Sequence, residues 1–154
     1  MAEGGTGKGD KAREGAVRAF RLEESGLERV LGELEASVME AVWRLEEASV
    51  QEVCDALGPG HNYKTVMTVM NRLVEKRLLS RRRVCKAYLY SAVESRQAFL
   101  GRVSRSVAAG LVRDFGSAAI AQFVDVVHEL APEELAMLEE LIHDKVGQRR
   151  GGKG

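Results

Sequence analysis

The sequence predicts a mainly α-helical fold with a small β-hairpin wing: a winged helix-turn-helix followed by a C-terminal helical region. Apolar residues recur at helical spacing in three successive segments between Leu31 and Lys76. The period then changes to that of two short strands around a turn, between Leu78 and Tyr90. Three more amphipathic segments follow, from Ser95 to Val146. Three helices followed by a hairpin is the element order of a winged helix.

The first two predicted helices pack through apolar stripes. Helical spacing predicts a helix over Leu31–Leu45, and Glu46–Ala48 is expected to be a short connector. Ser49 is a predicted N-cap, because Glu52 stands three residues later and completes a capping box. Gly58-Pro59-Gly60 ends the second helix, since glycine permits a left-handed cap and proline does not continue the helix.

The third predicted helix, Asn62–Lys76, has an unusual outer face. Its inner face is apolar, with Val66, Val69, Met70, Leu73 and Val74. The outer face carries Lys64, Thr68, Asn71, Arg72 and Glu75. The exposed face of an ordinary solvated helix mixes acids and cations freely. This face instead holds hydroxyl groups, an amide and cations, with Glu75 as its single acid. This face is therefore the predicted binding face.

The charge distribution also singles out this region. The 154 residues carry 23 Lys and Arg and 23 Asp and Glu, so the net charge is zero. Residues 61–90, however, hold eight cations against Glu75 alone, a net charge of +7. Residues 28–60 and 111–146 each hold two cations against eight acids, a net charge of −6. A basic band within acidic surroundings is typical of polyanion binding.

Double-stranded DNA is the predicted partner, because the major groove admits one helix and short polar side chains read base edges there. Alternate residues of a strand face opposite ways, so either Arg81 and Arg83 or Arg82 alone would point at DNA. The candidate DNA-binding residues are Asn62, Tyr63, Lys64, Thr65, Met67, Thr68, Asn71, Arg72, Arg81, Arg82, Arg83 and Lys86.

The chain divides into four predicted parts. Residues 1–26, which are rich in glycine, are predicted to be a flexible tail, and 27–92 the winged-helix domain. Residues 93–146 form a helical dimerisation region, because apolar faces beyond a complete domain need a partner, and 147–154 are a disordered tail. The predicted dimerisation residues are Phe99, Val103, Val107, Leu111, Ile120, Phe123, Val124, Val127, Leu135, Leu138, Leu141 and Ile142.

Other functions find no support in the sequence. No nucleophile motif and no glycine-rich phosphate loop after a strand is present, so we predict neither an enzyme nor a cofactor. His61, His128 and His143 lack ligand spacing with each other or with cysteine, which predicts no metal site. Cys54 is expected to be buried and Cys85 exposed in the wing. No apolar run approaches the roughly 20 residues of a membrane span, and we expect no secretory signal and a cytoplasmic location.

Three strings of the chain resemble the BlaI/MecI penicillinase-repressor family. They are LGELEASVMEAVW at Leu31–Trp43, YKTVMTVMNRLVEKRLL at Tyr63–Leu79 and KAYLY at Lys86–Tyr90. The resemblance extends over roughly Leu31 to Val146. It implies a homodimeric winged-helix repressor of an antibiotic response, which binds a palindromic operator and is cleared by a sensor-linked protease when an inducer is sensed.

Three positions depart from the family pattern. Arg77 stands where the family usually has a glycine after the third helix, so this residue is expected to adopt a left-handed cap. Val84-Cys85-Lys86 replaces a glycine at the tip of the wing. Gln122-Phe123 stands where the related β-lactam repressors are cut at an Asn-Phe bond, which makes it the candidate cleavage site. The C-terminal region also lacks the Cys-x-Cys pair of the copper-responsive branch.

Two alternatives remain open from the sequence. One is a winged-helix regulator of the MarR type, in which a small molecule, and not a protease, releases the DNA. The other is a winged helix used only for protein contacts, against which the basic outer face argues.

Overall fold

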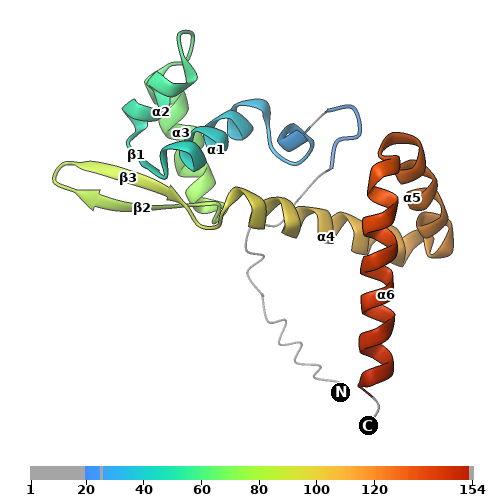
Figure 1. Ribbon diagram of the computed structural model, residues 1–154. Coiled ribbons are helices and arrows are strands. Elements are labelled where there is room, and N and C mark those ends of the chain that lie inside the picture. Colours follow the sequence, from blue (N-terminus) through green and yellow to red (C-terminus); the bar gives the residue numbers. More distant parts are fainter. Residues whose placement is uncertain (1–19, 25, 153–154) are drawn as a thin grey trace, which may run out of the picture. The chain divides into compact units, whose positions relative to one another are not determined.

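The computed structural model describes residues 20–24 and 26–152 (Figure 1). The chain forms two compact units, the first ending at Ser104 and the second beginning at Arg105. None of the described helices is long and apolar enough to cross a membrane.

The first unit is a helical domain with a small sheet, as predicted (Figure 1). The 3-10 helix η1 (Gly26–Arg29) precedes three helices, α1 (Glu33–Leu45), α2 (Val50–Leu57) and α3 (Tyr63–Glu75). Strand β1 (Glu47–Ala48) lies between α1 and α2, and the hairpin of β2 (Leu79–Val84) and β3 (Ala87–Ala92) follows α3. This hairpin is called the wing below. Helix α4 (Arg96–Phe115) begins in this unit.

The sheet corrects one prediction. Its strand order is β1-β3-β2, and both pairings are antiparallel. Glu47 pairs with Ser91 and Ala48 with Tyr90, so the segment predicted to be a connector is instead an edge strand. A two-residue strand has no periodicity of its own, because only its pairing with β3 defines it.

The core of the first unit lies where the three helices meet the sheet. It contains Val38, Val42, Val53, Val66, Met70, Leu73, Leu79 and Tyr90, all at most 2% exposed. Cys54 is buried as expected, and this burial raises the pKa of its thiol. The apolar stripes of α1, α2 and α3 thus meet each other, which leaves the opposite face of α3 in solvent.

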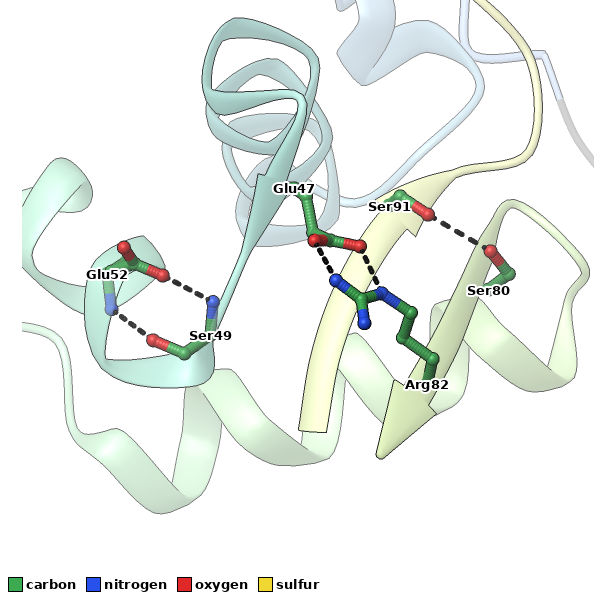
Figure 2. A network of polar contacts seen from close by, with 6 residues as sticks. All are labelled: Glu47, Ser49, Glu52, Ser80, Arg82 and Ser91. Carbon is green, nitrogen blue, oxygen red and sulfur yellow. Dashed lines mark hydrogen bonds and ion pairs between the residues drawn. The ribbon is translucent and has the colours of Figure 1, made fainter. Parts of the chain in front are cut away.

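The predicted backbone signals are present. The Ser49 hydroxyl accepts from the Glu52 amide at 3.2 Å, and the Glu52 carboxylate accepts from the Ser49 amide at 2.7 Å (Figure 2). This is the predicted capping box. Arg77 has a φ of 60°, which confirms the left-handed cap expected after α3. Cys85, at the turn of the wing, is also left-handed, with a φ of 55°.

Two residues predicted to mediate dimerisation are already buried within the first unit. Phe99 is 2% exposed and Val103 is 7% exposed, and the Phe99 ring contacts Trp43 of α1. Both side chains are therefore already covered in the single chain, unlike the other residues predicted to mediate dimerisation. Helical spacing identified the apolar face of α4, but spacing does not reveal which element covers that face.

The second unit contains the end of α4, then α5 (Ser117–Leu130), the 3-10 helix η2 (Pro132–Glu134) and α6 (Leu135–Gly151). No residue from 105 to 152 is buried. Helix α6 runs through to Gly151, although residues 147–154 were predicted to be a disordered tail. Arg149 and Arg150 lie in its last turn, where cations favour the helix dipole.

The predicted N-terminal tail lies mostly outside the described residues. Within the described part, the Arg21 amide donates to the Arg29 carbonyl at 2.8 Å. The Arg29 guanidinium lies 5.6 Å from the centroid of the Phe20 ring.

Candidate nucleic-acid interface

Helix α3 presents a polar face to solvent. Tyr63, Lys64, Thr65, Thr68 and Arg72 are all exposed on it. Met67 is half-buried at the border of this face. The Thr68 hydroxyl donates to the Lys64 carbonyl at 2.8 Å, within the helix. This face therefore offers hydroxyl groups and two cations, which is the chemistry the sequence predicted.

Asn62 has a structural role at the start of α3. Its side-chain oxygen accepts from the Lys64 amide at 2.8 Å, so it is the N-cap of the helix. The first turn contains no acid, so no carboxylate of that turn offsets the positive end of the helix dipole. Tyr63 is 48% exposed beside this end. An incoming phosphate would meet the helix N-terminus and the Tyr63 hydroxyl together.

Asn71, a candidate DNA-binding residue, has two hydrogen-bond partners within the protein. Its side-chain oxygen accepts from the Tyr90 hydroxyl at 2.8 Å and from Arg81 Nη1 at 2.8 Å. A bidentate contact with adenine needs this oxygen as the acceptor for the exocyclic amine. The oxygen is instead used within the protein, where it connects α3 to both strands of the wing.

One face of the wing continues the face of α3. Arg81 pairs with Tyr90 and Arg83 with Tyr88 across the hairpin, so these four side chains share the side on which Asn71 lies. The Arg81 guanidinium lies 4.7 Å from the centroid of the Tyr88 ring. Arg83 Nε donates to the Cys85 carbonyl at 3.2 Å. Both arginines remain exposed.

Arg82 faces the other way and is neutralised. Its guanidinium donates to both carboxylate oxygens of Glu47, at 2.8 and 2.6 Å, across the central strand (Figure 2). Ser80 and Ser91 lie on the same side of the sheet as Arg82, and their hydroxyl groups are hydrogen-bonded to each other at 3.2 Å (Figure 2). The hydrogen bond from Arg82 holds the pKa of the Glu47 carboxyl below its usual range. The alternation of the strand therefore separates Arg82 from Arg81 and Arg83.

Several cations of α3 and the wing form no ion pair within the described parts of the chain. They are Lys64, Arg72, Arg81, Arg83 and Lys86. Lys76, by contrast, forms an ion pair with the buried Glu35 at 2.7 Å, which connects the end of α3 to α1. The charge count included Lys76 and Arg82 in the basic band, but the structure pairs both internally. Tyr88 and Tyr90 were missed, because their partners lie on other elements.

The predicted dimerisation residues of the second unit remain uncovered. Ile120, Phe123 and Ile142 are each more than half exposed, and Leu111, Val124 and Leu141 are exposed to between 39% and 49%. Val107, Val127, Leu135 and Leu138 are half-buried. Gln122 and Phe123 line an apolar groove of about 410 Å³ with Leu111, Phe115, Ala118, Ala119 and Val126.

Across residues 20–24 and 26–152, no three His, Cys, Asp or Glu side chains lie together as a metal-binding group would require. Cys85 is exposed, as the sequence predicted.

Known proteins are similar to this chain over most of its length. The penicillinase repressor family matches residues 31–144. The transcriptional regulator BlaI of Mycobacterium tuberculosis, in strains CDC 1551 and H37Rv, is 36% identical over 102 residues, which are 63% of this chain and 73% of the relative. A solved structure of Bordetella bronchiseptica BpsR, described as regulated in its DNA binding by 6-hydroxynicotinic acid, aligns with 66% of this chain and 80% of its own. That alignment has 16% identity and a TM-score of 0.42.

The family match spans all three strings on which the resemblance was based, together with α4, α5 and most of α6. The exposed face of α3 and the wing lie inside the matched range. The chain therefore belongs to the penicillinase repressor family, whose members are transcriptional regulators and not enzymes.

Proposed function

We propose that this repressor binds a palindromic operator in cytoplasmic DNA as a homodimer, with α3 of each protomer in a major groove. The observation that carries the proposal is the continuity of the exposed face of α3 with the Arg81 and Arg83 face of the wing. The cations on this combined surface form no ion pair with a carboxylate within the described residues. Phosphates would supply the missing negative charge.

The side chains on α3 divide into two roles. Thr65 and Thr68 are short hydrogen-bonding groups near the middle of the exposed face, where base edges lie. Lys64 reaches guanine or phosphate, and the methyl group of Thr65 suits a thymine methyl. Arg72 lies near the end of the helix, where it contacts the phosphate backbone of the DNA. The wing arginines add phosphate contacts on the flank.

A second copy of the chain is the proposed partner of the second unit. The helices between 105 and 152 contain no fully buried residue, so much of their apolar surface still faces water in the single chain. Residues of exposed apolar surface such as Phe123 and Ile142 would be covered in a dimer. Two linked DNA-binding domains also bind two half-sites far more tightly than one domain binds one half-site.

Repression is proposed to end when a sensor-linked protease cleaves the Gln122–Phe123 bond and the repressor leaves its operator. Both residues are exposed on α5, in a unit whose helices lack a core, so local opening of this helix costs little. A cut would separate the two halves of the dimer region without altering α3. The proposal predicts that a chain ending at Gln122 is monomeric and loses its operator.

The salt dependence of binding tests the DNA-binding surface. Four cations in each protomer, Lys64, Arg72, Arg81 and Arg83, give eight phosphate contacts in a dimer. Each contributes about 0.9 to the slope of log affinity against log salt concentration, so we expect a slope of about −7. The measurement is a fluorescence anisotropy titration with a duplex from the repressor's own promoter. A slope shallower than about −3 contradicts the two-protomer surface.

A further inference from the structure

Asn71 lies at the junction of α3 and the wing. Its oxygen accepts from Tyr90 of β3 and from Arg81 of β2, each at 2.8 Å. We propose that Asn71 is a positioning residue, which holds Arg81 beside α3 as a phosphate contact and does not itself read a base. The inference rests on the proposed function, because it concerns how the same surface is assembled.

The Tyr90 hydroxyl fixes the orientation of the Asn71 amide. Tyr90 is 2% exposed, and its hydroxyl has the Asn71 oxygen as its acceptor. A buried hydroxyl without an acceptor is costly, so this bond is maintained in the folded protein. The amide oxygen of Asn71 is thereby aimed at the wing, where Arg81 meets it.

The nature of the acceptor determines what Arg81 can still do. Arg82 is paired with the Glu47 carboxylate, whose negative charge offsets that of the guanidinium. Arg81 is held by a neutral amide on one side and by the face of Tyr88 at 4.7 Å on the other. Both groups orient the guanidinium but leave its full positive charge available. Two adjacent arginines of one strand are thus oriented by different means, and of the two only Arg81 presents a charge that is not paired with a carboxylate.

The salt slope distinguishes a positioning role from a reading role. Asn71 is uncharged, so Asn71→Ala alters the slope only if another residue loses its phosphate contact. The probe is a short duplex of mixed sequence, on which base reading contributes nothing. The full-length variants Asn71→Ala, Arg81→Ala and the double variant are titrated over a series of salt concentrations. Arg82→Ala is the matched control, one residue away on the opposite face.

We expect Arg81→Ala and Asn71→Ala each to reduce the slope by about 0.9 for each bound protomer. The double variant reduces it no further, and Arg82→Ala leaves it unchanged. A normal slope for Asn71→Ala, or additive losses in the double variant, overturns the inference. Failure of the wild-type chain to bind the duplex would instead contradict the proposed function itself.

A second pair of variants guards against misfolding. Asn71→Ala leaves the buried Tyr90 hydroxyl without an acceptor, which threatens the fold. Tyr90→Phe combined with Asn71→Ala removes the hydroxyl and its acceptor together, so no buried hydroxyl is left without a hydrogen-bond partner. Its slope is compared with that of Tyr90→Phe alone, and the same reduction of about 0.9 for each protomer is expected. An unchanged slope in this comparison also overturns the inference.

Discussion

The ring centroids of Trp43 and Phe99 lie 5.6 Å apart, with their planes inclined at 51°. This contact joins α1 to the first turn of α4, and the Trp43 indole also donates to the Glu94 carbonyl at 3.0 Å. Arg96 adds a contact from α4 to the Glu40 carboxylate of α1, at 3.0 Å to both oxygens. The start of α4 is therefore part of the winged-helix domain.

Removing the Phe99 ring should destabilise the first unit. Phe99 is 2% exposed, so Phe99→Ala leaves a cavity against Trp43 and should lower the free energy of unfolding by about 3–5 kcal/mol. Urea unfolding followed by Trp43 fluorescence measures the change. Gln97→Ala, at an exposed position in the same turn, is the control and should alter stability by less than about 0.5 kcal/mol. Equal effects of the two substitutions would contradict the buried position of Phe99.

Base reading and backbone binding should separate in single variants. Thr65→Ala should weaken binding to the operator by about 1–3 kcal/mol and relax the preference at one base pair. Arg72→Ala should weaken binding to every sequence about equally, because phosphates carry no sequence information. Competition titrations with a set of singly substituted operators measure both effects. A uniform loss for Thr65→Ala would remove it from the reading face.

Local sequence patterns predicted the elements but not the partners of the polar side chains. The apolar stripes of α1 to α3 and the capping box at Ser49 depend on residues three or four positions apart, so sequence spacing alone predicts them. Arg82 meets Glu47 from 35 positions away and Asn71 meets Tyr90 from 19 positions away. Such pairs depend on sheet order and on how the wing is placed beside α3. The sequence therefore located the excess of cations in residues 61–90, but the internal partners of Asn71 and Arg82 were not evident from it.

The ion pair between Glu35 and Lys76 should make stability depend on pH. Burial alone would raise the pKa of Glu35, but the hydrogen bonds from Lys76 and the Gly32 amide, with the charges of Lys76 and Arg72, outweigh it and lower the pKa. A carboxyl with a lowered pKa in the folded state stabilises the fold above its unfolded value, near 4.5, and loses this contribution as the pH falls through the folded value. Glu35→Gln should thus cost stability at neutral pH.

Urea unfolding at neutral pH and well below pH 4.5 checks this expectation. The difference between wild type and Glu35→Gln should be largest at neutral pH and should shrink in acid. Glu33→Gln, an exposed position on the same helix, is the control and should show no comparable trend. A difference that grows as the pH falls would have the wrong sign for this ion pair.

Splitting the proposed dimer should abolish tight operator binding without damaging the reading surface. Phe123 is 59% exposed in the single chain, so Phe123→Asp places no charge in the core of a protomer but would place one inside the dimer. We expect this variant to sediment as a monomer. Its affinity for a two-half-site operator should fall by about 100- to 10,000-fold, since the linkage between two binding domains is lost. Affinity for a single half-site should stay as in the wild type.

Asp125→Asn, an exposed position two residues away on α5, is the matched control and should remain dimeric. A Phe123→Asp variant that still sediments as a dimer would show that the apolar face of α5 is not the contact between protomers.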